Sequence, residues 1–229
     1  MKLSLEQIEE LYIFTRQHYV EWYDLQSELV DHLANAIEEE WKQNPNDSFD
    51  QILNKEFKKF GVFGFMGVVE EKQKFLRKKY ALLIWNYYKE FFSFPKIILT
   101  LSFIYGLTFL LNVFESPTDV FIGMSLFLLA LTVGMSYLRH RKMKIKNDRR
   151  GYKFLFEEIG ISSSIKSFLF LLVFYFIRHF LRSSAWYNWH TIVFSAVLVL
   201  IILFLYIDHT VIPKKVAEDL TKSYPEYSL

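Results

Sequence analysis

Three side chains that could do chemistry lie close together in the acidic stretch 23–41, YDLQSELVDHLANAIEEEW. They are Glu28, Asp31 and His32, and a helix would bring Glu28 and His32 to one face because they are four residues apart. Such a group could bind a metal ion or sense pH through the imidazole. These positions also flank an apolar stripe, where polar residues edge helix contacts. We therefore favour a structural or partner-facing role, and expect the three to contact a protein partner.

A second group of ionisable residues surrounds the end of a hydrophobic run near residue 180. It could bind an anion or line the entrance of a transport path. Long basic side chains near the end of a span also reach to the interface simply to lower the cost of their charge, which is the simpler interpretation. The residues of this outer polar cluster are Arg178, His179, Arg182 and His190.

A third group is the basic run 139–153, RHRKMKIKNDRRGYK, which holds eight lysines and arginines. Such a run either sets the topology of a membrane protein or contacts anionic lipid headgroups. The expected lipid contacts are Arg139, Arg141, Lys142, Lys144, Lys146, Arg149 and Arg150.

The sequence carries no motif of a catalytic or cofactor site. It has no glycine-rich phosphate loop, no HExxH and no nucleophile elbow. It also has no cysteine, which excludes disulfides, thiolate metal ligands and cysteine nucleophiles. We therefore predict that the chain is not an enzyme and binds no cofactor or metal.

Charge is distributed unevenly along the chain. Residues 1–71 hold 15 acids and 6 bases, a net charge of −9, whereas residues 72–96 hold 7 bases and 1 acid. An acidic domain followed by a basic collar does not fit direct nucleic-acid binding, but it fits a domain held off an anionic membrane surface. The N-terminus lacks an apolar segment, so no cleavable signal peptide is expected.

The first 78 residues are predicted to form a small helical domain. Ser4 with Gln7, and Ser48 with Gln51, have the spacing of capping boxes at two helix starts. Gly61 is placed to end the third helix. One face of the first helix is predicted to carry Leu5, Ile8, Tyr12, Thr15 and Tyr19, and an apolar stripe of the second helix is predicted to carry Leu25, Leu29, Leu33, Ala36 and Ile37.

A further segment, about 63–92, connects this domain to the hydrophobic half. Its aromatic stripe falls at residues 83–84, 87–88 and 91–92. It could pack on the core of the N-terminal domain or lie in the membrane interface, and the sequence leaves both open.

Four hydrophobic runs are each close to the length that spans a bilayer. They cover about 97–114, 120–138, 161–181 and 191–207, which predicts two hairpins. Within the second run, Gly123, Ala130 and Gly134 favour close helix packing or a dimer contact.

Lysine and arginine counts set the expected orientation. The run 139–153 holds eight, the connection 115–119 holds none, and the connection 182–190 holds one. Both termini and the basic loop are therefore expected in the cytoplasm.

The stretch Glu28-Leu29-Val30-Asp31-His32-Leu33, with Phe60-Gly61 later, resembles the HAAS-type signalling module. That family's pattern is E-L-x-x-H-L in one helix and an apolar residue plus glycine closing a later one. The family usually has a proline soon after that glycine, whereas this chain has Val62-Phe63-Gly64. The resemblance covers residues 5–75 and implies a regulatory or adaptor role, often linked to PadR-like transcriptional regulators.

We therefore predict an all-α integral membrane protein of the bacterial inner membrane. Its parts are a cytoplasmic domain 1–78, a connecting helix 79–96, four spans within 97–207 around a basic loop 139–153, and a tail 208–229. The expected function is that of a signalling or adaptor protein whose N-terminal domain binds a protein partner. A structural subunit of a larger membrane assembly, oligomeric or with other proteins, and a small-molecule or lipid transport component are the alternatives.

Overall fold

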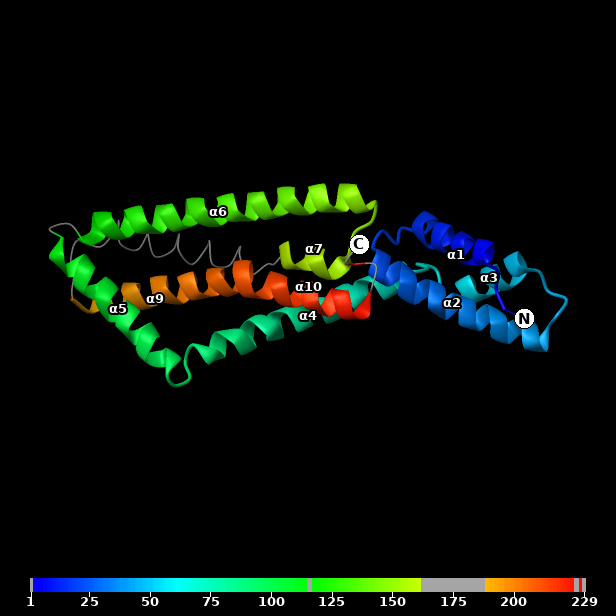
Figure 1. The fold of residues 1–229 in the computed structure, drawn as a ribbon, viewed down its shortest axis with the longest axis horizontal. Coiled ribbons are helices and arrows are strands. Elements are labelled where there is room, and N and C mark those ends of the chain that lie inside the picture. The colour runs from blue at the N-terminus through cyan, green and yellow to red at the C-terminus, as the bar shows by residue number, and fades with distance from the viewer. Residues whose placement is uncertain (1, 115–116, 162–187, 225–226, 228–229) are drawn as a thin grey trace. The chain divides into compact units, whose positions relative to one another are not determined.

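The structure is a computed structural model that describes residues 2–114, 117–161, 188–224 and 227. Among these residues the regular structure is helical, apart from one isolated β-bridge (Figure 1). The chain divides into two compact units. The head unit consists of Met1–Lys78 and Ile145–Ile159, and the membrane unit of Lys79–Lys144 and Gly160–Leu229.

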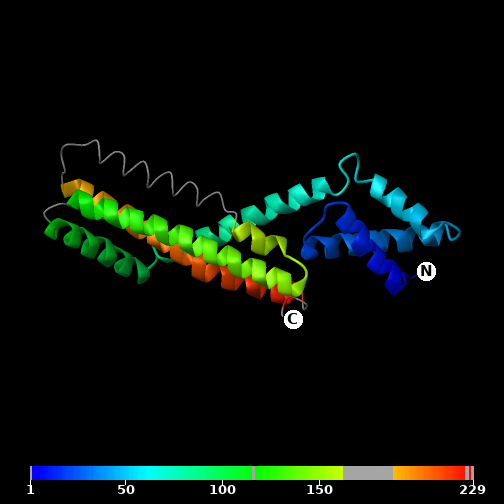
Figure 2. The same cartoon turned by 90° about the horizontal axis from the view of Figure 1, so that it is seen from above.

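The head unit is built on α1 (Leu5–Gln17), α2 (Tyr23–Gln43) and α3 (Phe49–Lys58), with α1 and α3 packed on α2 (Figure 2). Both predicted capping boxes are confirmed. At the start of α1 the Gln7 N–H donates to Ser4 Oγ at 3.3 Å, and the Ser4 N–H donates to Gln7 Oε1 at 2.9 Å. Gly61 follows α3 with φ +76°, a conformation that suits glycine at a helix end.

The core of the head unit forms around α2. The predicted stripe of this helix is confirmed at Leu25, Leu29, Leu33 and Ile37, which are buried, while Ala36 is half-buried. Of the residues predicted to share one face of the first helix, Leu5 is 83% exposed, and Tyr19, which lies beyond the end of α1, is 76% exposed. The buried residues of α1 are Leu11 and Thr15.

The membrane unit contains α5 (Lys96–Val113), most of α6 (Pro117–Arg150), α9 (Asn188–Tyr206), η1 (Ile207–Val211) and α10 (Ile212–Ser223). Three stretches among the described residues are long and apolar enough to cross a membrane: Lys96–Val113, Ile122–Arg150 and Trp189–Ser223. They overlap almost all of the first and second predicted spans and contain the fourth. The third, 161–181, lies almost wholly outside the described residues.

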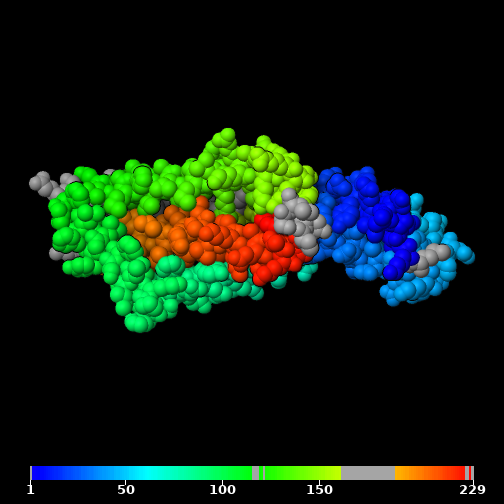
Figure 3. All heavy atoms as spheres, viewed as in Figure 1, coloured from blue at the N-terminus to red at the C-terminus, as the bar shows by residue number. Residues whose placement is uncertain are grey.

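The first two of these stretches are hardly buried. Only 11% of the apolar window in α5 and 6% of that in α6 lie inside the protein, against 56% for the last stretch. Figure 3 shows α5 and α6 forming a wide outer surface of this unit. Apolar helices with so little burial are suited to contact lipid or other membrane helices.

The basic run 139–153 is not a loop in conformation, which corrects the prediction. Helix α6 continues into this run and ends at Arg150, and the next residue, Gly151, has φ +77°. The reason is its composition, since Arg, Lys and Met are good helix formers and no glycine or proline interrupts them before Gly151.

The connecting segment belongs to α4 (Met66–Glu90), whose residues from Lys79 onward lie in the membrane unit. Its buried side chains there include Tyr80 and Ile84, and the Tyr88 hydroxyl donates to the Leu200 carbonyl at 3.4 Å. The inward face of this half therefore packs within the membrane unit, with Tyr88 against α9. Trp85, 55% exposed, lies on the outer face.

Candidate functional site

A short segment far along the sequence completes the head unit. Residues 151–158, which we call the docked segment, follow α6 and lie on the start of α2. Trp22 and Lys153 form a parallel β-bridge, and the Tyr23 N–H donates to the Lys153 carbonyl at 2.8 Å. The head unit is thus assembled from two separate parts of the chain, joined by backbone hydrogen bonds.

Asp24 holds the docked segment through the start of α7 (Leu155–Ile161). Its Oδ1 accepts from the N–H of Leu155 at 3.1 Å and from that of Leu25, also at 3.1 Å. The first N–H groups of a helix have no partner within the helix, so Asp24 supplies one from α2. Asp24 is 3% exposed, and burial raises the pKa of this carboxyl although backbone hydrogen bonds from Leu155, Phe156 and Leu25 oppose the shift.

Side chains strengthen the same contact. The Trp22 indole donates to Glu158 Oε2 at 2.6 Å, and Lys153 pairs with Glu21 while its Nζ lies 5.3 Å from the centre of the Trp22 ring. Three consecutive apolar residues of the segment are buried: Phe154, Leu155 and Phe156. Their burial supplies the main driving force for docking, because each such side chain contributes about 1.5–3 kcal/mol when removed from water.

Glu157 ties the docked segment back to the end of α6. Its carboxylate lies 2.7 Å from Lys146 Nζ and 3.6 Å from Arg150 Nη1. The last turns of α6 and the docked segment therefore form one connected structure.

A second buried polar cluster lies in the membrane unit. The Tyr80 hydroxyl of α4 donates to Asp208 Oδ1 at 2.7 Å, and Arg139 Nη1 of α6 donates to the Asp208 carbonyl at 3.1 Å. The same arginine lies 3.7 Å from Asp208 Oδ2, and His209 Nδ1 lies 3.1 Å from that oxygen. Burial and then the Asp208 charge raise the pKa of Tyr80, so the phenol stays protonated and donating.

Two local features make this cluster possible. Asp208 lies in η1, a π-helical turn, and such turns often occur at functional positions in longer helices. Gly160 lies against the cluster, where a Cβ atom would be 2.9 Å from Tyr80 Cε2 and 3.0 Å from Arg139 Nη2. Only glycine fits there without a shift of the neighbours.

The predicted partner-contact residues lie on the surface of α2. Glu28, Asp31 and His32 are all exposed. Glu28 pairs with Lys72, whose Nζ lies 2.6 Å from Oε2, and the His32 ring lies 6.1 Å from that of Phe60. Among the residues that the structure describes, no three or more His, Cys, Asp or Glu side chains are grouped to hold a metal ion.

The seven predicted lipid-contact residues divide between two faces of α6. Arg139, Lys146 and Arg150 are at i, i+7 and i+11, and each pairs with a carboxylate. These three residues therefore contribute to the fold, and the lipid contact of all seven stays a prediction. The exposed basic residues are Arg141, Lys142, Lys144 and Arg149.

Of the outer polar cluster, Arg178, His179 and Arg182 lie outside the described residues. His190 is 7% exposed, and its ring lies 3.9 Å from that of Trp189. A side chain this buried does not suit a solvent-exposed anion site.

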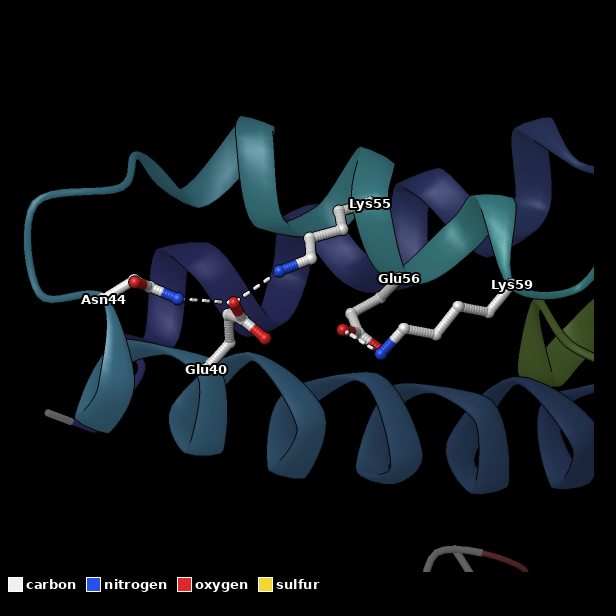
Figure 4. A network of polar contacts seen from close by, with 5 residues as sticks. All are labelled: Glu40, Asn44, Lys55, Glu56 and Lys59. Carbon is white, nitrogen blue, oxygen red and sulfur yellow. Dashed lines mark hydrogen bonds and ion pairs between the residues drawn. The ribbon is translucent and has the colours of Figure 1, made fainter.

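A further polar network joins α2 to α3 within the head unit (Figure 4). Glu40 accepts from Lys55 at 2.5 Å and from Asn44 at 2.7 Å, and both hydrogen bonds lower the pKa of this carboxyl. Glu56 and Lys59 form a separate pair at 2.5 Å. The Glu40–Lys55 contact joins the two helices of this hairpin.

Asp24, Tyr80 and Asp208 were not predicted as site residues. Asp24 has the position of an ordinary first-turn acid, and Asp208 that of a boundary residue after a hydrophobic run. One signal in the sequence could have pointed to Asp208. Its carboxylate directly follows the apolar residues 191–207, and a charge at the end of such a run needs a partner.

Comparison of the chain with protein-family models, curated proteins and solved structures gave no match.

Proposed function

We propose that this protein is a membrane-anchored signalling or adaptor protein whose head unit binds a protein partner. The observation that carries the proposal is the docked segment. Its contacts place it in the head unit, and α6, which directly precedes it in the chain, contains a stretch suited to cross a membrane. A change in the spans can therefore act on the head through a second connection besides α4.

The same observation supports the predicted topology. Residues 1–78 and 145–159 form one unit, which supports the proposal that both lie on one side of the membrane. The chain must cross an even number of times between them, as it does if α5 and α6 are both spans. With the basic residues of α6 beside it, this side is the cytoplasm of a bacterial cell.

The C-terminal tail is proposed to lie on that side too. Lys79 Nζ of α4, which precedes the first span, lies 3.1 Å from Asp219 Oδ2 of α10. For α9 to cross from the outer side to the cytoplasmic side, the chain between residue 159 and the start of α9 must cross the membrane an odd number of times. The predicted third span at 161–181 provides one, giving four in all.

The partner surface proposed for the head is the exposed side of α2 with Glu28, Asp31 and His32. The resemblance to the HAAS-type module supports this choice, since these residues belong to its first motif. The exposed residues Arg141, Lys142, Lys144 and Arg149 are proposed to attract anionic headgroups beside the membrane.

A photo-crosslinking amino acid placed in the full-length protein in native membranes tests the proposal. Asp31 is the test position, and Asp50 at the start of α3, an exposed acid on another helix, is the matched control. We expect position 31 to give an adduct with one soluble protein that position 50 does not give. Adducts with membrane proteins alone, or the same adducts from both positions, would contradict the adaptor function.

A structural role within a membrane assembly is the second candidate, because one observation favours it. Gly123, Ala130 and Gly134 recur at i, i+7 and i+11 on α6, and all three are exposed. A Cβ added at Gly123 or Gly134 would meet no atom within 4 Å, so another helix could approach this face closely. A crosslinker at Ala130 would then capture a membrane protein or a second copy.

A further inference from the structure

The head unit contains a cavity of about 410 Å³ that its proposed partner surface does not use. Side chains of α1, the start of α2 and Gly151–Tyr152 of the docked segment line it. This volume lies in the range of pockets that hold a small ligand or a large side chain.

Tyrosines form its aromatic walls. The rings of Tyr12 and Tyr23 are nearly parallel, at 7°, with their centres 6.1 Å apart, and the Tyr152 ring lies 4.8 Å from that of Tyr23. All three residues are half-buried, so each keeps part of its surface accessible. Aromatic faces attract cations, most strongly where water is partly excluded.

The charges at the cavity favour the same kind of ligand. Glu9 and Glu21 are both exposed at the lining, and Glu21 already holds one cation, the Nζ of Lys153. The one basic residue of the lining is Arg16, whose Nε donates to the Tyr12 carbonyl of its own helix at 3.2 Å. Residues 1–71, which supply both glutamates, have a net charge of −9, so the surroundings attract a positive ligand.

We infer that this cavity receives an arginine or lysine side chain from a basic segment of the protein partner. The inference rests on the proposed function and adds the chemistry of the partner. The cation would lie against the faces of Tyr12 and Tyr152 with Glu9 beside it, while the stem of the side chain contacts Ile8.

The docked segment makes this site conditional. Tyr152 is one of its walls, and its position depends on the contacts of Lys153 with Trp22 and of Leu155 with Asp24. Loss of docking would remove that wall, so the site can report the state of the spans to a partner.

The test uses the full-length protein in nanodiscs of phosphatidylcholine, which has no net charge to compete for a basic peptide. The probe is a fluorescent peptide of alternating glycine and arginine, followed by anisotropy. A peptide with citrulline in place of arginine has the same shape without the charge. The variants are Tyr12→Leu, Tyr12→Phe and Glu9→Gln, with Glu39→Gln as the control because Glu39 is exposed on α2 outside the cavity.

We expect Tyr12→Leu and Glu9→Gln each to weaken binding by about 2- to 5-fold, while Tyr12→Phe and Glu39→Gln leave it unchanged. Asp24→Ala should weaken binding and Asp24→Asn should not. Equal binding of the citrulline peptide, or equal losses from Glu9→Gln and Glu39→Gln, would overturn the inference. If the inference is overturned in this way, a soluble-protein adduct at position 31 would show that the proposed function still holds, at another surface. The absence of that adduct would show that the inference and the proposed function both fail.

Discussion

The Asp24 carboxylate of α2 accepts a hydrogen bond at 3.1 Å from the backbone of Leu155, which lies 131 positions further along the chain. The bond caps the start of α7 and holds the docked segment against the head. Two stretches suited to cross a membrane lie between these residues. The contact therefore connects the head to the far end of the first predicted hairpin.

Replacing Asp24 separates its role as an acceptor from its charge. Asp24→Ala leaves the Leu155 N–H buried without its acceptor, so we expect the head to lose about 1–3 kcal/mol of stability. Asp24→Asn keeps an acceptor oxygen and should lose much less. Hydrogen exchange at Leu155 and Phe156 measures the effect directly, and equal protection in the two variants would contradict this assignment.

The raised pKa of Asp24 predicts a pH dependence of opposite sign to that of a surface carboxylate. The folded head binds this proton more readily than the unfolded chain, whose aspartates titrate near the ordinary value of 3.8. The contribution of Asp24 to the free energy of unfolding is thus fully present below pH 3.8 and is lost as the pH rises through the raised pKa. Denaturant unfolding of the wild type and Asp24→Asn should show the wild type losing stability relative to the variant over that range. A wild type that gains stability relative to Asp24→Asn as the pH rises would contradict it.

Arg139 and Arg141 should behave differently although both belong to one basic run. Arg139→Ala leaves the buried Asp208 carboxylate without its guanidinium partner, and breaking a buried pair in this way costs about 3–5 kcal/mol. Arg141 is exposed, so Arg141→Ala should leave thermal unfolding in detergent unchanged and weaken binding to anionic vesicles. Equal melting temperatures for the two variants would rule out the structural role of Arg139.

Two helical glycines provide a matched pair for the Asp208 cluster. Gly160→Ala would bring a methyl group to 2.9 Å from Tyr80, and forcing extra volume into a packed site costs about 1–3 kcal/mol. Gly67→Ala in α4 meets no atom within 4 Å, so it should be neutral or stabilise by up to about 1 kcal/mol. Thermal unfolding of both variants checks the contrast, and a stable Gly160→Ala would mean that Tyr80 and Arg139 are not packed on this glycine.

Local signals allowed part of the fold to be predicted from sequence. The capping boxes at Ser4 and Ser48 and the stripe of α2 depend on residues three or four apart, and all were found. The burial of Leu11 in α1 was not predicted, because which side of this helix meets α2 is a tertiary choice. The cavity was not predicted for the same reason, since its α1 side includes Leu5, Ile8 and Tyr12, which the sequence groups on one helical face.

The site could not be predicted for the same physical reason. Asp24 and Leu155 meet only after the chain has folded back, and no local pattern marks either residue. Arg139 has the same residue type as its exposed neighbours, so composition could not separate the paired from the exposed bases. Helical phase could have done so, because Arg139, Lys146 and Arg150 share one face of α6.

The docked segment is the central claim, and crosslinking tests it most directly because the chain has no cysteine of its own. Glu21→Cys and Lys153→Cys replace an exposed ion pair, and a short bifunctional thiol reagent is added to native membranes. Glu39→Cys with Lys153→Cys is the control, since Glu39 lies near the other end of α2. We expect an intrachain crosslink in the first pair and none in the second. No crosslink between positions 21 and 153, or equal crosslinking of both pairs, would contradict a head unit completed by residues 151–158.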